Sequence, residues 1–103
     1  MVKVSVFYAY DPGKKFDMDY YCKHHMALVK ERFGSALKSI AVEQGVAGGE
    51  PGAPPKFIAM GHMYFDSADA FHRAFAPHAE EIVADVKNYT DLEPMIQISE
   101  VKM

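Results

Sequence analysis

The stretch Lys56–Phe65, KFIAMGHMYF, has apolar residues at both odd and even positions. A β-strand points alternate side chains to opposite faces of its sheet. One face of this strand would carry Ile58, Met60 and Tyr64, and the other would carry Phe57, Ala59, Met63 and Phe65. A strand with two apolar faces needs cover on both sides. We therefore expect a sheet with helices on one face and a second copy of the same sheet on the other, although Lys3 and Ser5 make one face of the first strand more polar.

The segments on either side predict the order strand, helix, strand, strand, helix, strand. Gly48–Pro55, GGEPGAPP, is a glycine- and proline-rich loop before the central stretch. After it, Asp66 or Ser67 is expected to cap a helix that Pro77 kinks and that ends near Asn88. The other predicted elements are strands at Val2–Tyr10, Leu37–Val46 and Met95–Lys102, and a helix that Asp17 caps and Gly34 ends. This order predicts an α+β, ferredoxin-like βαββαβ fold, with two helices on one face of an antiparallel sheet.

Length and charge exclude several classes of protein. The 103 residues fit one domain, which we expect to span residues 1–103. A net charge of −3 and scattered basic residues argue against nucleic acid as a partner. A single cysteine excludes an intrachain disulfide. No secretory signal and no long apolar run are visible, so we expect a cytoplasmic protein with no membrane association.

The stretch Tyr20–Val29, YYCKHHMALV, places two adjacent histidines on the first predicted helix. At 100° per residue, His25 falls within the apolar arc and His24 on its edge. The same count places Cys22 toward the apolar arc, as a small buried hydrophobe. An inward histidine has two interpretations. It is either a core imidazole satisfied by a neighbouring hydrogen bond, or a residue that transfers protons near neutral pH.

The expected topology brings further polar aromatic residues toward His25. We expect the first and third strands to be parallel neighbours, so that the first strand ends beside the end of the third. This arrangement predicts a pocket for a small hydrophobic or phenolic ligand. The candidate catalytic residues are His25, Tyr8 and Tyr64, and the candidate pocket residues from the same reasoning are Tyr10, Tyr21 and His62. His78 is added because it could share a helix face with Phe71, Phe75 and Ile82.

Five histidines raise the question of a metal. His24–His25 and His72–His78 lack the i,i+4 spacing of a two-histidine helical site, and no carboxylate–histidine motif accompanies them. We therefore predict neither a metal site nor a cofactor. A haem held by one histidine requires no spacing motif, and a haem protein stays an alternative.

Three segments resemble the EthD family. Residues 20–34, YYCKHHMALVKERFG, resemble its "Y…HMPLVKE…G" helix, and residues 61–75, GHMYFDSADAFHRAF, resemble its strand-to-helix segment. Residues 85–101, DVKNYTDLEPMIQISEV, are similar to its closing motif. The family's proline after His-Met is Ala27 here, which predicts a more regular helix.

The resemblance implies a dimeric α/β barrel in which two ferredoxin-like sheets face each other. EthD proteins are linked to the degradation of ethyl tert-butyl ether beside a cytochrome P450 system and are often grouped with oxidoreductases. Similar barrels include cofactor-free monooxygenases, lactone isomerases, polyketide cyclases and haem proteins. Carried over by motif, the family's helix histidine is His25 and its closing-turn residues are Asn88, Tyr89 and Thr90.

Two functional hypotheses follow. The first is a homodimeric, cofactor-independent enzyme of small-molecule catabolism, of the oxidoreductase or the isomerase and cyclase type. His25 would be its acid or base, and Tyr8, Tyr64 or His62 would orient a phenolic, lactone or enol-type substrate. The second is a non-catalytic accessory protein that binds a hydrophobic metabolite or a partner protein of an ether-degradation pathway.

Overall fold

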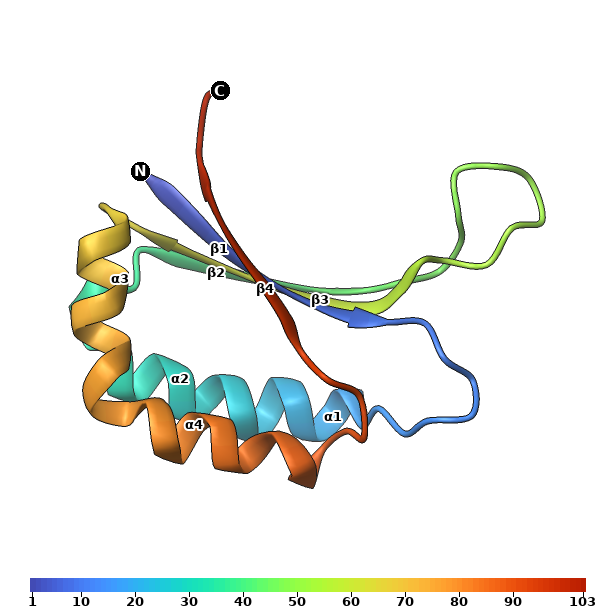
Figure 1. Ribbon diagram of the computed structural model, residues 1–103, viewed down its shortest axis with the longest axis horizontal. Coiled ribbons are helices and arrows are strands. Elements are labelled where there is room, and N and C mark those ends of the chain that lie inside the picture. The colour runs from blue at the N-terminus through green and yellow to red at the C-terminus, as the bar shows by residue number, and fades with distance from the viewer.

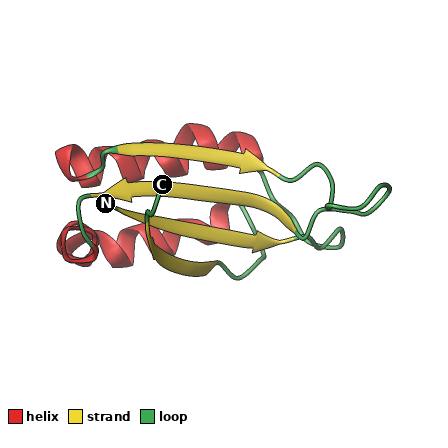
Figure 2. Cartoon of the chain, turned by 90° about the horizontal axis from the view of Figure 1, so that it is seen from above, coloured by secondary structure: helices red, strands yellow, loops and turns green.

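The four strands labelled in Figure 1 form one sheet. Their order is β2-β3-β1-β4, and every neighbouring pair is antiparallel. The computed structural model describes all residues, 1–103. The strands are β1 (Val2–Ala9), β2 (Ser39–Gln44), β3 (Phe57–Phe65) and β4 (Met95–Glu100). The helices lie together on one face of the sheet (Figure 2). The predicted α+β, ferredoxin-like βαββαβ fold is confirmed.

The expected direction of β3 is wrong, since β3 runs antiparallel to β1. The helical crossover after β1 leaves β2 running parallel to β1. The β2–β3 connection then reverses the chain, so β3 is antiparallel to both strands. In the resulting register Tyr8 lies opposite Ala59, while Ser5 lies opposite His62 and Lys3 opposite Tyr64. Tyr8 and Tyr64 are therefore at opposite ends of the β1–β3 pair.

The first helix consists of α1 (Met18–Tyr20), a π-helical turn η1 (Tyr21–His25) and α2 (Met26–Phe33). Asp17 caps it as predicted, because its side chain accepts a hydrogen bond from the backbone N–H of Tyr20. Gly34 ends it with a positive φ of 53°. The more regular helix expected from Ala27 is wrong, because the N–H of Met26 bonds to the carbonyl of Tyr21 five residues earlier.

The second helix is divided into four short segments. They are α3 (Ala68–Phe75), the 3₁₀ turn η3 (Ala76–His78), α4 (Ala79–Asp85) and the 3₁₀ turn η4 (Val86–Asn88). Ser67 is the residue that caps it, through a bond from the N–H of Ala70. The interruption predicted at Pro77 is confirmed, since this residue lies in the 3₁₀ turn between α3 and α4.

The two faces of the sheet differ in cover. The face under the helices carries the most buried residues, among them Val4, Tyr8, Ala59 and Phe65. The other face has no helix over it (Figure 2). At its centre the Ser5 hydroxyl lies 2.9 Å from Nδ1 of His62, and Nε2 of His62 lies 3.2 Å from the carboxylate of Glu43. None of the helices has the length and apolar character needed to cross a bilayer.

Candidate acid–base site

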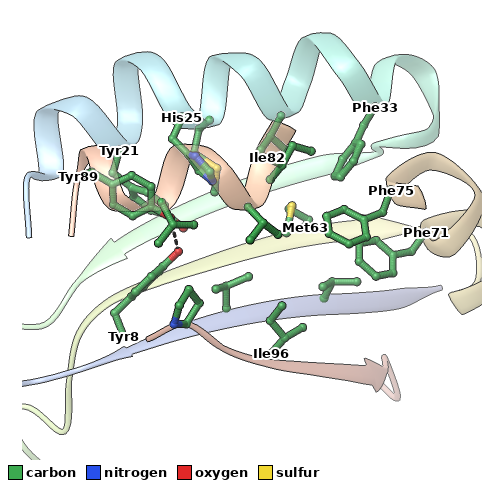
Figure 3. Close-up of a pocket in the computed structure, with 17 residues that line it drawn as sticks. Tyr8, Tyr21, His25, Phe33, Met63, Phe71, Phe75, Ile82, Tyr89 and Ile96 are labelled. Carbon is green, nitrogen blue, oxygen red and sulfur yellow. Dashed lines mark hydrogen bonds between the residues drawn. The ribbon is translucent and has the colours of Figure 1, made fainter. Parts of the chain in front are cut away.

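A cavity of about 110 Å³ lies between the covered face of the sheet and the helices (Figure 3). Seventeen residues line it, and fifteen of these are hydrophobic. Its volume is comparable to the roughly 150 Å³ of an engineered apolar cavity that binds benzene. The site therefore suits a small and mostly apolar molecule, with few polar groups to orient it.

His25 is the histidine that lines this cavity, and only 7% of its side chain is exposed. Its Nδ1 lies 2.9 Å from Oδ2 of Asp85 at the end of α4. The other oxygen of Asp85 accepts hydrogen bonds from the Tyr20 hydroxyl at 2.7 Å and from the Asn88 amide at 2.9 Å. Burial raises the pKa of Asp85, but the hydrogen bonds from Tyr20, Asn88 and His25 outweigh it and lower that pKa below its usual value. Asp85 is therefore a carboxylate near neutral pH.

A carboxylate only accepts hydrogen bonds, so the proton of neutral His25 belongs on Nδ1. The second ring nitrogen, Nε2, has no partner in the chain and is not fully enclosed. Its lone pair is thus available to a bound molecule. Burial lowers the pKa of His25 below its usual value, and the hydrogen bond and charge of Asp85 oppose that shift only in part. The imidazole is consequently neutral and able to act as a base at pH 7.

Tyr21 and Tyr89 contact the His25 ring, and Tyr8 contacts both of these tyrosines. The hydroxyls of Tyr8 and Tyr89 are 2.6 Å apart, and the ring of Tyr21 stacks on that of His25 at 5.6 Å between centroids (Figure 3). Burial raises the pKa of all three phenols, which therefore stay neutral. In a hydroxyl pair only one proton lies between the two oxygens. The second proton remains available to an oxygen atom of a ligand.

The structure brings together part of the predicted site. Tyr8, Tyr21, His25 and Tyr89 all line the cavity. Asn88 does not line it but holds the carboxylate of Asp85. The Thr90 hydroxyl donates to the backbone carbonyl of Lys15 and accepts from the N–H of Leu92, so it closes the turn that carries Tyr89.

Four other predicted residues lie elsewhere. His62 and Tyr64 are on the uncovered face, because antiparallel pairing and strand alternation direct them away from the helices. Tyr10 is 39% exposed, beyond the irregular end of β1. The 3₁₀ turn at Pro77 changes the helix phase, and His78 lines a separate groove with Arg32 and Arg73 instead.

The prediction of a buried Cys22 is also wrong, because this residue is exposed. The π-helical turn shifts the phase on which the helical count depended.

Asp85 is the residue of the candidate site that sequence reasoning missed. It lies sixty positions from His25 in the chain, and no local motif joins the two. One signal was present: Asp85 ends a helix, where the helix dipole disfavours a negative charge. A carboxylate at such a position requires hydrogen-bond donors of its own.

The metal and haem hypotheses can be compared with this geometry. No group of three or more histidine, cysteine, aspartate or glutamate side chains is arranged to hold a metal ion. Nε2 of His25 has no partner in the chain, but a cavity of about 110 Å³ is far too small for a haem. The residues present do not fit that group.

The EthD domain model matches residues 13–93, most of the chain. The chain belongs to the EthD family. It is similar along 99% of its length to an EthD-like protein from Ralstonia eutropha JMP134, with 49% identity, 92% of that chain covered and a TM-score of 0.95. The resemblance of the three sequence motifs to EthD proteins is thereby confirmed.

More distantly similar solved structures share the fold. An ethyl tert-butyl ether degradation (EthD) family protein from Bacillus halodurans C-125 is 21% identical, with 99% of both chains covered and a TM-score of 0.74. SnoaB, a cofactor-independent oxygenase from Streptomyces nogalater, is 12% identical, with 99% of this chain and 92% of that chain covered and a TM-score of 0.57. No curated protein matches the chain.

Proposed function

We propose that this EthD protein is a cofactor-independent enzyme that moves a proton on a small, mostly apolar molecule. One observation carries the proposal. The imidazole of His25 is fixed on one side by Asp85, lines an apolar cavity, and has a second ring nitrogen with no partner in the chain. A core histidine would need only a structural hydrogen bond, and it would not leave its basic nitrogen unpartnered beside an empty space.

The residues have distinct roles in this reaction. Nε2 of His25 removes a proton from a phenol, an enol, or a carbon next to a carbonyl group. Asp85 holds the ring and stabilises the imidazolium that forms. The hydroxyl pair of Tyr8 and Tyr89 donates to the substrate oxygen on which negative charge develops.

Proton removal is a first step shared by isomerases, cyclases and cofactor-free oxygenases. The likeness to SnoaB supports an oxygenase only at the level of the fold. Lactones, phenols and β-keto compounds are the substrate types that match the cavity and carry a removable proton. We therefore define the proposed activity by the proton transfer and leave the product class to the assay.

The proposed enzyme is a homodimer in which a second copy covers the open face of the sheet. Phe7 and Met60 lie opposite each other on that face, and Met95 beside them is 45% exposed. Covering such side chains would remove apolar area from water, at roughly 25 cal/mol per Å². In this arrangement the two cavities remain separate, one in each subunit.

The test measures hydrogen–deuterium exchange, which needs no knowledge of the product. A panel of β-keto compounds and lactones is incubated with the protein in D₂O, and loss of the α-proton is followed by NMR. For at least one compound we expect exchange above background, and His25→Gln should lower its rate by about 10²- to 10⁴-fold. His24→Gln is the matched control, because the neighbouring His24 is exposed, and its rate should not change.

The outcomes separate the hypotheses. Binding of panel compounds without any exchange would support the accessory hypothesis instead of an enzyme. Exchange that survives in His25→Gln would remove His25 from the reaction.

A further inference from the structure

The two ends of the cavity differ in chemistry (Figure 3). One end holds His25 and the hydroxyls of Tyr8 and Tyr89. The other end holds three phenylalanines, Phe33, Phe71 and Phe75, which contact one another at 5.4–6.4 Å between ring centroids. Ile82 lies between the two groups (Figure 3). Proton transfer at His25 makes no use of the phenylalanine end.

The distance between the ends is longer than one aromatic ring. His25 and Phe33 are eight residues apart on the helix, which corresponds to about 12 Å at 1.5 Å per residue. Tyr8 and Val4 line the same cavity from β1 and are four residues apart, which corresponds to about 13 Å. A ligand with its oxygen at the tyrosine pair therefore reaches the phenylalanine end only if it carries a further apolar part.

Charge restricts the polar part of the ligand. No lysine or arginine lines the cavity, and the nearest full charge is the Asp85 carboxylate behind His25. An anionic group placed there would lose its hydration without gaining a cation, which is costly in an apolar site. The hydrogen-bonding groups at this end suit a neutral oxygen.

We propose that the ligand is a neutral amphiphile, with one hydroxyl or carbonyl head at Tyr8 and Tyr89 and a short apolar tail against Phe33, Phe71 and Phe75. This inference rests on the proposed function for the location of the head. Phe33, Phe71 and Phe75 would form a tail subsite that selects ligands by their apolar part. Proton transfer itself does not require this subsite.

The experiment uses 4-alkylphenols as probes, with hydrogen, methyl, ethyl and propyl at the 4-position. Their dissociation constants are measured by calorimetry at pH 8, where phenols with a pKa near 10 are neutral. Each added CH₂ should tighten binding about three- to fourfold until the subsite is full. The anion 4-ethylbenzoate should bind at least tenfold more weakly than 4-ethylphenol.

Two variants locate the tail. Phe75→Ala removes a ring that lines the cavity and should abolish the gain from ethyl to propyl while the affinity for phenol stays within twofold. Phe57→Ala is the matched control, because Phe57 on β3 is a half-buried phenylalanine like Phe75 on α3 but does not line the cavity. Phe57→Ala should retain the full gain in affinity as the alkyl group of the phenol lengthens. The wild-type series is informative even if Phe75→Ala does not fold.

The results distinguish this inference from the proposed function. An affinity that is flat across the wild-type series, undetectable binding of every phenol, or equal affinity for the benzoate would overturn the inference. If substrate protons exchange in a His25-dependent way but the affinity does not change along the phenol series, the proton-transfer proposal stands. A rising series without exchange would contradict the proton-transfer proposal and retain the two-part ligand.

Discussion

At the scale of single residues, the free energy of protonating His25 is set by two opposing effects. Burial disfavours the charged imidazolium, whereas the Asp85 carboxylate at 2.9 Å favours it. Burial is the larger effect, and the folded-state pKa lies below the ordinary value of about 6.5. The unfolded chain therefore binds a proton at His25 more readily than the folded protein does.

This difference predicts how stability depends on pH. The free energy of unfolding should fall as pH decreases from about 6.5 toward the lower folded-state pKa of His25, because only the unfolded state gains the proton. Above that range His25 is neutral in both the folded and the unfolded state, so it does not change the free energy of unfolding with pH. His25→Gln lacks this contribution, so the stability of the wild type relative to His25→Gln should be smaller at pH 5 than at pH 7.5.

Urea unfolding of both proteins at the two pH values measures the effect. Asp85 titrates below this window, since its pKa is lowered below that of an ordinary aspartate. The other four histidines are present in both proteins. If wild type and His25→Gln differ in stability by the same amount at both pH values, burial does not lower the pKa of His25.

The sequence predicted the orientation of His25 but not its partner. A helical count was enough to place His25 inward, because the side chains of a helix follow one period. The same count was wrong for Cys22, because the π-helical turn changes that period over Tyr21–His25. Asp85 depends on a contact between two helices that no local pattern encodes.

At the scale of elements, the first helix approaches the sheet closely at one glycine. A Cβ at Gly61 on β3 would lie 2.2 Å from the Tyr21 hydroxyl and 2.9 Å from the methyl group of Met26. Glycine at this position therefore allows Tyr21 of the π-helical turn, and Met26 after it, to pack against the strand. The close contact explains why an otherwise apolar strand carries a glycine at its centre.

Gly61→Ala should consequently destabilise the protein by roughly 1–3 kcal/mol, as expected for overpacking. It should also displace Tyr21 and weaken phenol binding. Gly49→Ala is a suitable control, because a Cβ there meets nothing within 4 Å. Urea unfolding measures both variants, and equal stability of the two would contradict the close packing of η1 on β3.

The order and the caps of the elements followed from local signals. Asp17, Ser67, Gly34 and Pro77 each act where their chemistry predicted. The direction of β3 relative to β1 was mispredicted, and with it the positions of His62 and Tyr64. Strand direction depends on how crossovers and hairpins combine, which alternation along one strand does not reveal.

At the scale of the whole molecule, the open face of the sheet predicts a homodimer. Light scattering coupled to size exclusion should give about twice the 11.5 kDa chain mass at micromolar concentration. Met95→Glu places a charge on the open face and should shift the protein toward the monomer. Val46→Glu, at a position that is 90% exposed in the loop after β2, should stay dimeric. A wild-type monomer would contradict the proposed dimer.

The central claim is that Nε2 of His25 is an unprotonated base that meets the ligand. It is tested most directly by ¹⁵N NMR of histidine-labelled protein at pH 7.5, with and without 4-ethylphenol. We predict that His25 is the neutral tautomer with its proton on Nδ1, and that the phenol perturbs its Nε2 signal while that of His24 is unchanged. A proton on Nε2 in the free protein, or an Nε2 signal that bound phenol leaves unchanged, would contradict the account.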